Sequence, residues 1–118
     1  MMGGRAENDP GKPPHMTEDR IVVLERMLGA RPKDVRLRFG LALEYEKAGR
    51  TQDAVRELRA YLDQSEDEGN AWGRLGSLLS RLGREDEARE AYRRGVEQAT
   101  KHDHPTMAAE LEAALEER

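Results

Sequence analysis

Residues 72–92 read WGRLGSLLSRLGREDEAREAY, and residues 38–58 read RFGLALEYEKAGRTQDAVREL. Gly83 follows Gly49 by 34 positions, and the same shift carries Leu41 onto Leu75 and Ala54 onto Ala88 without a gap. A fixed period between about 20 and 50 residues indicates an array of supersecondary units that stack on one another. The sequence therefore predicts a repeat protein.

The spacing of apolar residues predicts helices throughout and no strand. Working outward from the repeats, we expect six helices. The first begins after an N-cap at Thr17 and ends before Pro32, and the second begins after an N-cap at Asp34. Gly49 and Gly83 each follow a helix, at a position where glycine accepts a positive φ. The fold class is predicted to be all-α.

The chain has 118 residues, which is the length of one domain. Residues 1–16 are rich in glycine and proline, and we expect an unstructured tail or a leader introduced by cloning. The rest is predicted to be a single domain, residues 17–118, made of a half repeat (17–31), two repeats (35–68 and 69–102) and a capping helix (103–118). Further N-caps are expected at Thr51 and at Gly69 or Asn70.

Composition narrows the classes of function. The net charge of −4 gives no bulk attraction to nucleic acid or to an anionic membrane. The absence of cysteine excludes disulfides, thiolate metal sites and cysteine nucleophiles. The sequence holds neither an apolar run of about 20 residues, as a membrane span needs, nor a secretory signal pattern. We expect a cytoplasmic protein.

The sequence offers little for catalysis or for binding of a cofactor. It holds no glycine-rich phosphate loop and no nucleophile motif. His102, Asp103 and His104 have the spacing of a metal-ligand cluster, but nothing nearby in the sequence completes a tetrahedral set. We therefore expect no metal, no cofactor and no enzymatic activity.

The second unit resembles a tetratricopeptide repeat (TPR). Trp72, Leu75 and Gly76 match the motif of its first helix, and Ala88 and Tyr92 match that of its second. The first unit matches less fully, because Arg38 stands where the motif has tryptophan. The resemblance covers about residues 17–115. It implies a right-handed superhelix of stacked antiparallel helix pairs, in which Trp72 fills the core.

The resemblance further implies that a peptide or protein segment binds on the concave face of that superhelix. The predicted face is mixed: the first repeat contributes two cations, two apolar groups and the anion Glu46, and the second contributes cationic, polar and small groups. This set suits an acidic segment with an apolar anchor. The alternative is a solvated face without a ligand. The predicted contact residues are Arg36, Phe39, Leu43, Lys47, Asn70, Arg74, Ser77 and Arg81.

The first helix raises a second hypothesis. Val22 and Val23 lie where a further helix would cover them in a longer array, and residues 1–16 cannot supply one. An uncovered apolar end favours weak association with a second copy of the chain, which would make the protein an oligomerisation or structural module. The alternative is that Val22 is a single exposed side chain without consequence.

Overall fold

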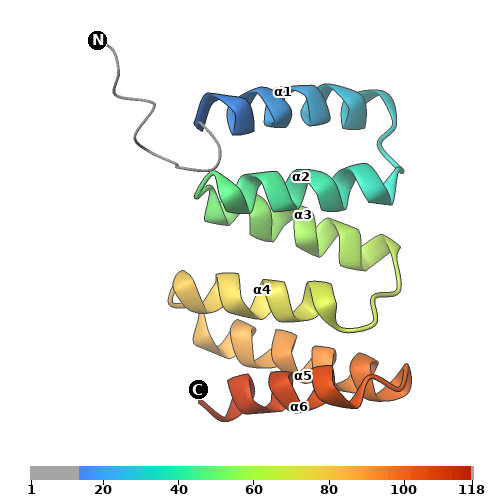
Figure 1. The fold of residues 1–118 in the computed structure, drawn as a ribbon, viewed down its shortest axis with the longest axis vertical. Coiled ribbons are helices and arrows are strands. Elements are labelled where there is room, and N and C mark those ends of the chain that lie inside the picture. The colour runs from blue at the N-terminus through green and yellow to red at the C-terminus, as the bar shows by residue number, and fades with distance from the viewer. Residues whose placement is uncertain (1–13, 118) are drawn as a thin grey trace. The chain divides into compact units, whose positions relative to one another are not determined.

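A computed structural model describes residues 14–117 as six α-helices joined by short turns, with no strand among these residues (Figure 1). The all-α class and the number of helices are therefore confirmed for the described part of the chain. The helices are α1 (Pro14–Ala30), α2 (Val35–Lys47), α3 (Thr51–Gln64), α4 (Asn70–Arg81), α5 (Glu85–Lys101) and α6 (Pro105–Glu116).

The helices form two compact units. The first ends at Glu57 and the second begins at Leu58, so the division falls inside α3. In the first unit α1 packs against α2, and in the second unit α4 packs against α5 and α5 against α6. The arrangement of all repeats into one right-handed superhelix and a single domain stays a prediction.

The first unit is built on an antiparallel pair, α1 and α2 (Figure 1). Ile21 of α1 and Leu41 and Tyr45 of α2 are buried in its core. The predicted N-cap at Thr17 is wrong, because α1 begins at Pro14 and the Thr17 side chain is buried. Proline suits the first turn of a helix, since its fixed φ is helical and its missing N–H would have had no partner there. The predicted tail otherwise lies outside the described residues.

Two helices of the repeats end in the same way. Gly49 and Gly83 both have φ 76°, as their predicted positions require. After α2 the Arg50 N–H donates to the Tyr45 carbonyl at 2.9 Å, and after α4 the Arg84 N–H donates to the Leu79 carbonyl at 2.9 Å. This is a Schellman motif, and its glycine reverses the chain without strain.

The starts of the helices were predicted less accurately. Asp34 is confirmed as the N-cap of α2, because its carboxylate accepts from the Arg36 and Leu37 N–H groups at 3.0 and 3.2 Å. Thr51 is the first residue of α3 rather than its cap, since the Arg50 carbonyl already accepts from the Ala54 N–H at 3.0 Å. The helix therefore begins one residue earlier than predicted. Arg50 is the only residue between Gly49 of the Schellman motif and α3, so it takes the cap position.

The start of α4 depends on a buried acid that the pattern of caps did not predict. Gly69 occupies the N-cap with φ 129° and has no side chain to accept a hydrogen bond. The carboxylate of Asp67 instead accepts from the Gly69 and Ala71 N–H groups, both at 2.9 Å. Glycine suits this position because φ 129° strains any side chain, and a β-carbon there would stand 3.2 Å from the Gly95 carbonyl oxygen and 2.7 Å from the Met107 sulfur.

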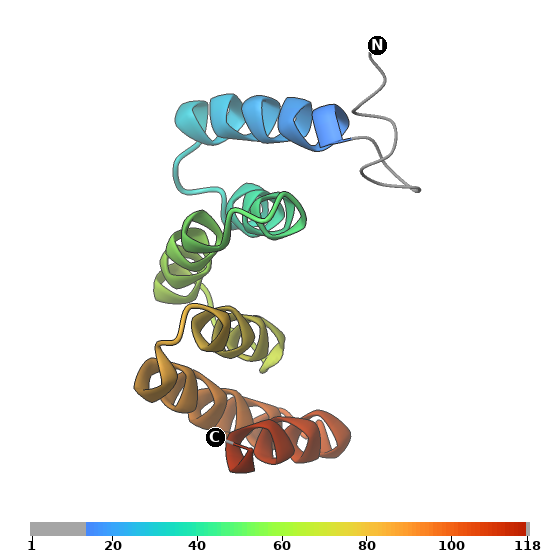
Figure 2. The ribbon, with the colours of Figure 1, turned by 90° about the vertical axis from the view of Figure 1, so that its left-hand side faces the viewer.

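Small residues bring the helices of the second unit close together. A β-carbon at Gly73 would lie 2.8 Å from one methyl group of Leu111, and a β-carbon at Gly95 would lie 2.8 Å from the other. Leu111 of α6 is thus held between α4 and α5, and Figure 2 shows α5 and α6 side by side. This contact fits the predicted capping role of the last helix.

We expect Asp103→Gly to stabilise the protein by about 0.5–1 kcal/mol, because Asp103 is a non-glycine residue at a left-handed position. Its φ is 63°, and the His104 N–H donates to the Ala99 carbonyl at 2.8 Å, as in the two glycine-containing turns. Urea denaturation of the variant measures the gain. Asp103→Val should lower stability by more than about 1 kcal/mol, and equal stabilities of the two variants would contradict the explanation.

Candidate functional site

The predicted binding residues of the first repeat form one stripe on α2, which we name the α2 surface: Arg36, Phe39, Leu43 and Lys47. Arg36 is exposed and has no ion pair or side-chain hydrogen bond within residues 14–117. Phe39 and Leu43 are half-buried. The Lys47 ammonium lies 3.4 Å from Glu44 Oε2, so this cation is partly neutralised. The α2 surface therefore combines apolar side chains with one uncommitted cation.

The corresponding stripe on α4, which we name the α4 surface, holds Asn70, Arg74, Ser77 and Arg81. Asn70 and Arg81 are exposed, whereas Arg74 and Ser77 are half-buried. Arg81 has no side-chain partner within the described residues. Helical spacing places the four side chains on the same face of α4.

The α2 surface belongs to the first unit and the α4 surface to the second. The structure brings the four residues of each surface together along their own helix. That the two surfaces form one concave binding face stays a prediction.

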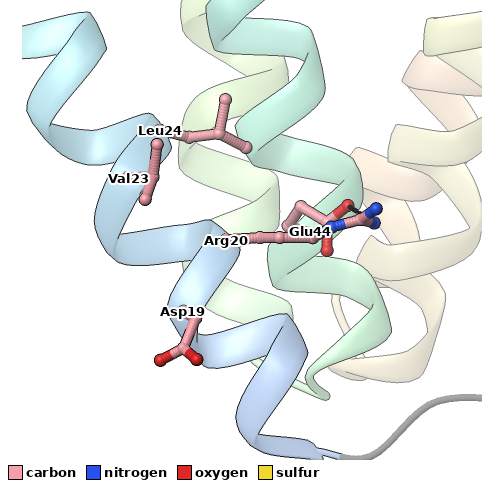
Figure 3. Close-up of a pocket in the computed structure, with 5 residues that line it drawn as sticks. All are labelled: Asp19, Arg20, Val23, Leu24 and Glu44. Atoms are coloured by element: carbon pink, nitrogen blue, oxygen red, sulfur yellow. Dashed lines mark hydrogen bonds and ion pairs between the residues drawn. The ribbon is translucent and has the colours of Figure 1, made fainter.

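A hollow of about 400 Å³ lies between α1 and α2, and its residues were not among the predicted site residues. Asp19, Arg20, Val23 and Leu24 of α1 and Glu44 of α2 line it (Figure 3). The Arg20 guanidinium reaches across the hollow to Glu44 Oε2, at 3.3 Å. One of these residues could have been found from the repeat period. Leu24 lies 34 positions before Leu58, which is buried, so the period predicts that Leu24 faces the neighbouring helix.

The tetratricopeptide-repeat family model matches residues 39–103, which is more than half of the chain. The chain belongs to the tetratricopeptide-repeat family. No curated protein matches it in sequence. Repeats of this family generally mediate contacts between proteins and are typically non-catalytic. The match begins after α1, so the assignment of α1 to a half repeat stays a prediction.

No helix within residues 14–117 of this TPR protein has both the length and the apolar character to cross a membrane. Its cytoplasmic location stays a prediction.

The tyrosine at the centre of the first unit lies in an unusual electrostatic setting. The Tyr45 hydroxyl donates to Glu25 Oε2 at 2.5 Å, which ties α2 to α1. The Arg50 guanidinium stands 4.6 Å from the centre of the ring. Burial, together with the hydrogen bond to Glu25, raises the pKa of Tyr45 from 10.0 to about 12.

We expect the tyrosine ionisation that disappears in Tyr45→Phe to be centred near pH 12. The folded-state pKa lies above the unfolded value, so Tyr45 contributes stability that is complete below about pH 10 and is lost as pH rises toward 12. A spectrophotometric titration of the wild type and the variant measures this. A missing step near pH 10 instead would show that the hydroxyl is solvated.

The histidines between α5 and α6 of the TPR protein contact two acids that lie 36 positions earlier in the sequence. His102 Nε2 lies 3.0 Å from Glu66 Oε2, and His104 Nε2 lies 2.6 Å from Glu68 Oε1. The hydrogen bond with His102 lowers the pKa of the Glu66 carboxyl, and the one with His104 lowers the pKa of the Glu68 carboxyl. These contacts connect the segment before α4 to the turn after α5.

The approach of Glu66 and Glu68 to these histidines was not predicted from the sequence. Even so, no group of three or more acidic or histidine side chains within residues 14–117 is arranged to hold a metal ion. The hydrogen bonds of His102 and His104 with Glu66 and Glu68 therefore join the turn after α5 to the segment before α4.

Trp72 is less buried than its motif position predicts. Its side chain is half-buried and lines a hollow of about 210 Å³ together with Leu62 and Leu75. The Arg94 guanidinium stands 5.4 Å from the indole centre, within the range of a cation–π contact. Trp72 was predicted to be a core residue, but it is only half-buried. The side chain of α5 that lies over its ring is the cation Arg94 and not an apolar residue.

Proposed function

We propose that this TPR protein is a non-catalytic module that binds a segment of another protein through the α2 surface and the α4 surface. The observation that supports this most is the state of two exposed cations. Arginines elsewhere in the repeats are largely ion-paired, for example Arg38 with Glu57 and Arg59 with Glu87. Arg36 and Arg81, one on each surface, have no such partner within the described residues.

The two surfaces suggest the chemistry of the partner. A guanidinium without a carboxylate partner can bind a carboxylate of another chain through two parallel hydrogen bonds. Half-buried Phe39 and Leu43 give an apolar side chain of the partner a place to pack. We therefore propose an acidic segment that carries an apolar anchor.

A random peptide library displayed on phage provides the test. Selection on the wild-type protein should enrich peptides that combine Asp or Glu with one large apolar residue. The variant Arg36→Glu/Arg81→Glu should bind a selected peptide at least about tenfold more weakly, because each attractive contact becomes repulsive. The binding of the wild type should also weaken as salt is added.

Arg31→Glu/Lys33→Glu is the matched control, because Arg31 and Lys33 are exposed cations outside both surfaces and the net charge changes by the same amount. It should bind the selected peptide almost as well as the wild type. An equal loss in the control would mean that net charge alone drives binding. Selection of peptides without acidic residues would refute the proposed partner chemistry.

A second candidate function is supported by a separate observation. The large hydrophobic side chains that are exposed within the described residues are Val22, Val23 and Met27, at 50%, 49% and 40%, and all three lie on α1. We propose that α1 also mediates weak self-association. Sedimentation of the wild type should show reversible dimers that Val22→Glu removes, and identical monomeric behaviour of both proteins would refute it.

A further inference from the structure

The outward face of α1 carries a stripe of four residues, which we name the α1 stripe: Asp19, Val22, Val23 and Arg26. Their spacing of three, one and three positions places them together on a helix. Buried Ile21 marks the opposite side, which packs toward α2. Figure 3 shows Arg20 and Leu24 of α1 pointing toward α2, and Asp19 and Val23 line the same hollow beside them.

The charges at the two ends of the α1 stripe are uncommitted. Neither Asp19 nor Arg26 makes an ion pair or a side-chain hydrogen bond within residues 14–117. Their neighbours differ in this respect, since Arg20 contacts Glu44 and Glu25 contacts Tyr45. The stripe thus presents an exposed apolar centre with an acid at one end and a base at the other.

This order of residues is complementary to itself when reversed. If two copies of α1 lie antiparallel about the midpoint between Val22 and Val23, Val22 of each faces Val23 of the other. Asp19 of each copy then faces Arg26 of the other, which creates two ion pairs by symmetry. A parallel arrangement would instead oppose Asp19 to Asp19 and Arg26 to Arg26, which is repulsive.

We infer that a second copy of this chain docks antiparallel on the α1 stripe. The inference rests on the self-association proposed above and specifies its surface, orientation and register. Gly29 and Ala30, also exposed, leave room for close approach at the end of the helix. A single helix–helix contact buries less surface than the roughly 1,200 Å² of a stable interface, so the dimer should be weak and reversible.

Charge reversal tests the register. Asp19→Arg alone places two arginines opposite each other, and Arg26→Asp alone does the same with two aspartates. Each single variant should dimerise at least about tenfold more weakly than the wild type in sedimentation equilibrium, measured from about 10 µM to about 1 mM. The double variant Asp19→Arg/Arg26→Asp restores both pairs and should regain dimerisation to within about threefold.

An equimolar mixture of the two single variants should also dimerise, since every facing pair is then of opposite charge. Glu97→Arg is the matched control, because it changes the net charge by the same amount as Asp19→Arg at an exposed position of α5. It should leave dimerisation unchanged. Circular dichroism of each variant verifies that the helix content of the chain is unchanged.

The orientation is tested by spin labels on Ala30→Cys, which introduces the only cysteine in the chain. Antiparallel pairing separates the two labelled positions by about 22 Å along the helix axes, whereas parallel pairing places them at the helix spacing of about 8–10 Å. A distance in the shorter range would overturn the inference.

The outcomes separate this inference from the broader proposal. A wild type that stays monomeric at all concentrations overturns both the self-association and the α1 stripe as its surface. If dimers form and Val22→Glu removes them, but the double reversal fails to restore dimerisation, the antiparallel register is overturned and self-association through α1 stands. Binding of acidic peptides to the α2 and α4 surfaces is independent of either result.

Discussion

Replacing Arg38 with leucine is expected to destabilise the first unit by about 3 kcal/mol, because it leaves a buried carboxylate without its main partner. The Arg38 guanidinium lies 2.8 Å from Glu57 Oε1, and the two side chains are only 16% and 9% exposed. Arg38 Nη2 also donates to the Pro32 carbonyl at 3.0 Å. Arg56 stays 3.3 Å from Glu57 Oε2 but is mostly exposed, so it offsets only part of the loss.

The repeat period supplies a matched pair for this test. In the second repeat the positions of Arg38 and Glu57 are held by Trp72 and Ala91, and Ala91 is buried. The double variant Arg38→Trp/Glu57→Ala should therefore recover most of the stability that Arg38→Leu loses, since it removes the buried charge with its partner. Urea denaturation followed by circular dichroism measures both. A loss under about 1 kcal/mol in Arg38→Leu would show that Glu57 is solvated.

The helices and their turns could be predicted because they depend on residues close together in the sequence, and the same pattern of residues occurs in both repeats. Gly49 and Gly83 have the left-handed backbone that their spacing indicated, and Asp34 caps the helix that it was expected to cap. Glu57 and Asp67 could not be predicted in the same way. Both are buried acids, but for different reasons: Glu57 pairs with Arg38, 19 positions away in the sequence, whereas Asp67 accepts from the nearby Gly69 and Ala71 N–H groups although it stands two residues before the N-cap position.

The candidate surfaces show the same limit. Helical spacing predicts which α2 residues and which α4 residues share a face, but it could not predict which neighbouring side chains are already in contact with other segments. Gly73 lies beside Arg74 on α4 and is covered by Leu111, and the Ser80 hydroxyl is taken by Glu85 Oε2 at 3.0 Å. Both contacts depend on where other segments pack. The α1 stripe could be predicted only in part. Val22 and Val23 suggested an uncovered apolar surface, but only the structure shows that Asp19 and Arg26 have no partner within residues 14–117.

Gly76→Val is expected to destabilise the second unit by about 3 kcal/mol, because α4 and α5 meet at this glycine. A β-carbon at Gly76 would stand 2.9 Å from two atoms of the Tyr92 ring and 3.0 Å from a third. The ring is buried and cannot swing away, so the helices must separate. Gly76→Ala should cost about 1–2 kcal/mol by the same mechanism, even though alanine is the better helix former. Fluorescence of Trp72, which lies on α4, follows the unfolding of this unit in urea.

Gly40→Ala is the matched control, because Gly40 also lies inside a helix but a β-carbon there would meet nothing within 4 Å. It should stabilise the protein by about 0.5–1 kcal/mol through helix propensity and the smaller entropy of the unfolded chain. The same substitution is thus expected to have opposite signs at two helical glycines. Tyr92→Leu should recover part of the loss in Gly76→Val, since it removes the ring that the added carbons strike. If Gly76→Ala were as stabilising as Gly40→Ala, α4 and α5 would not be in close contact at this position.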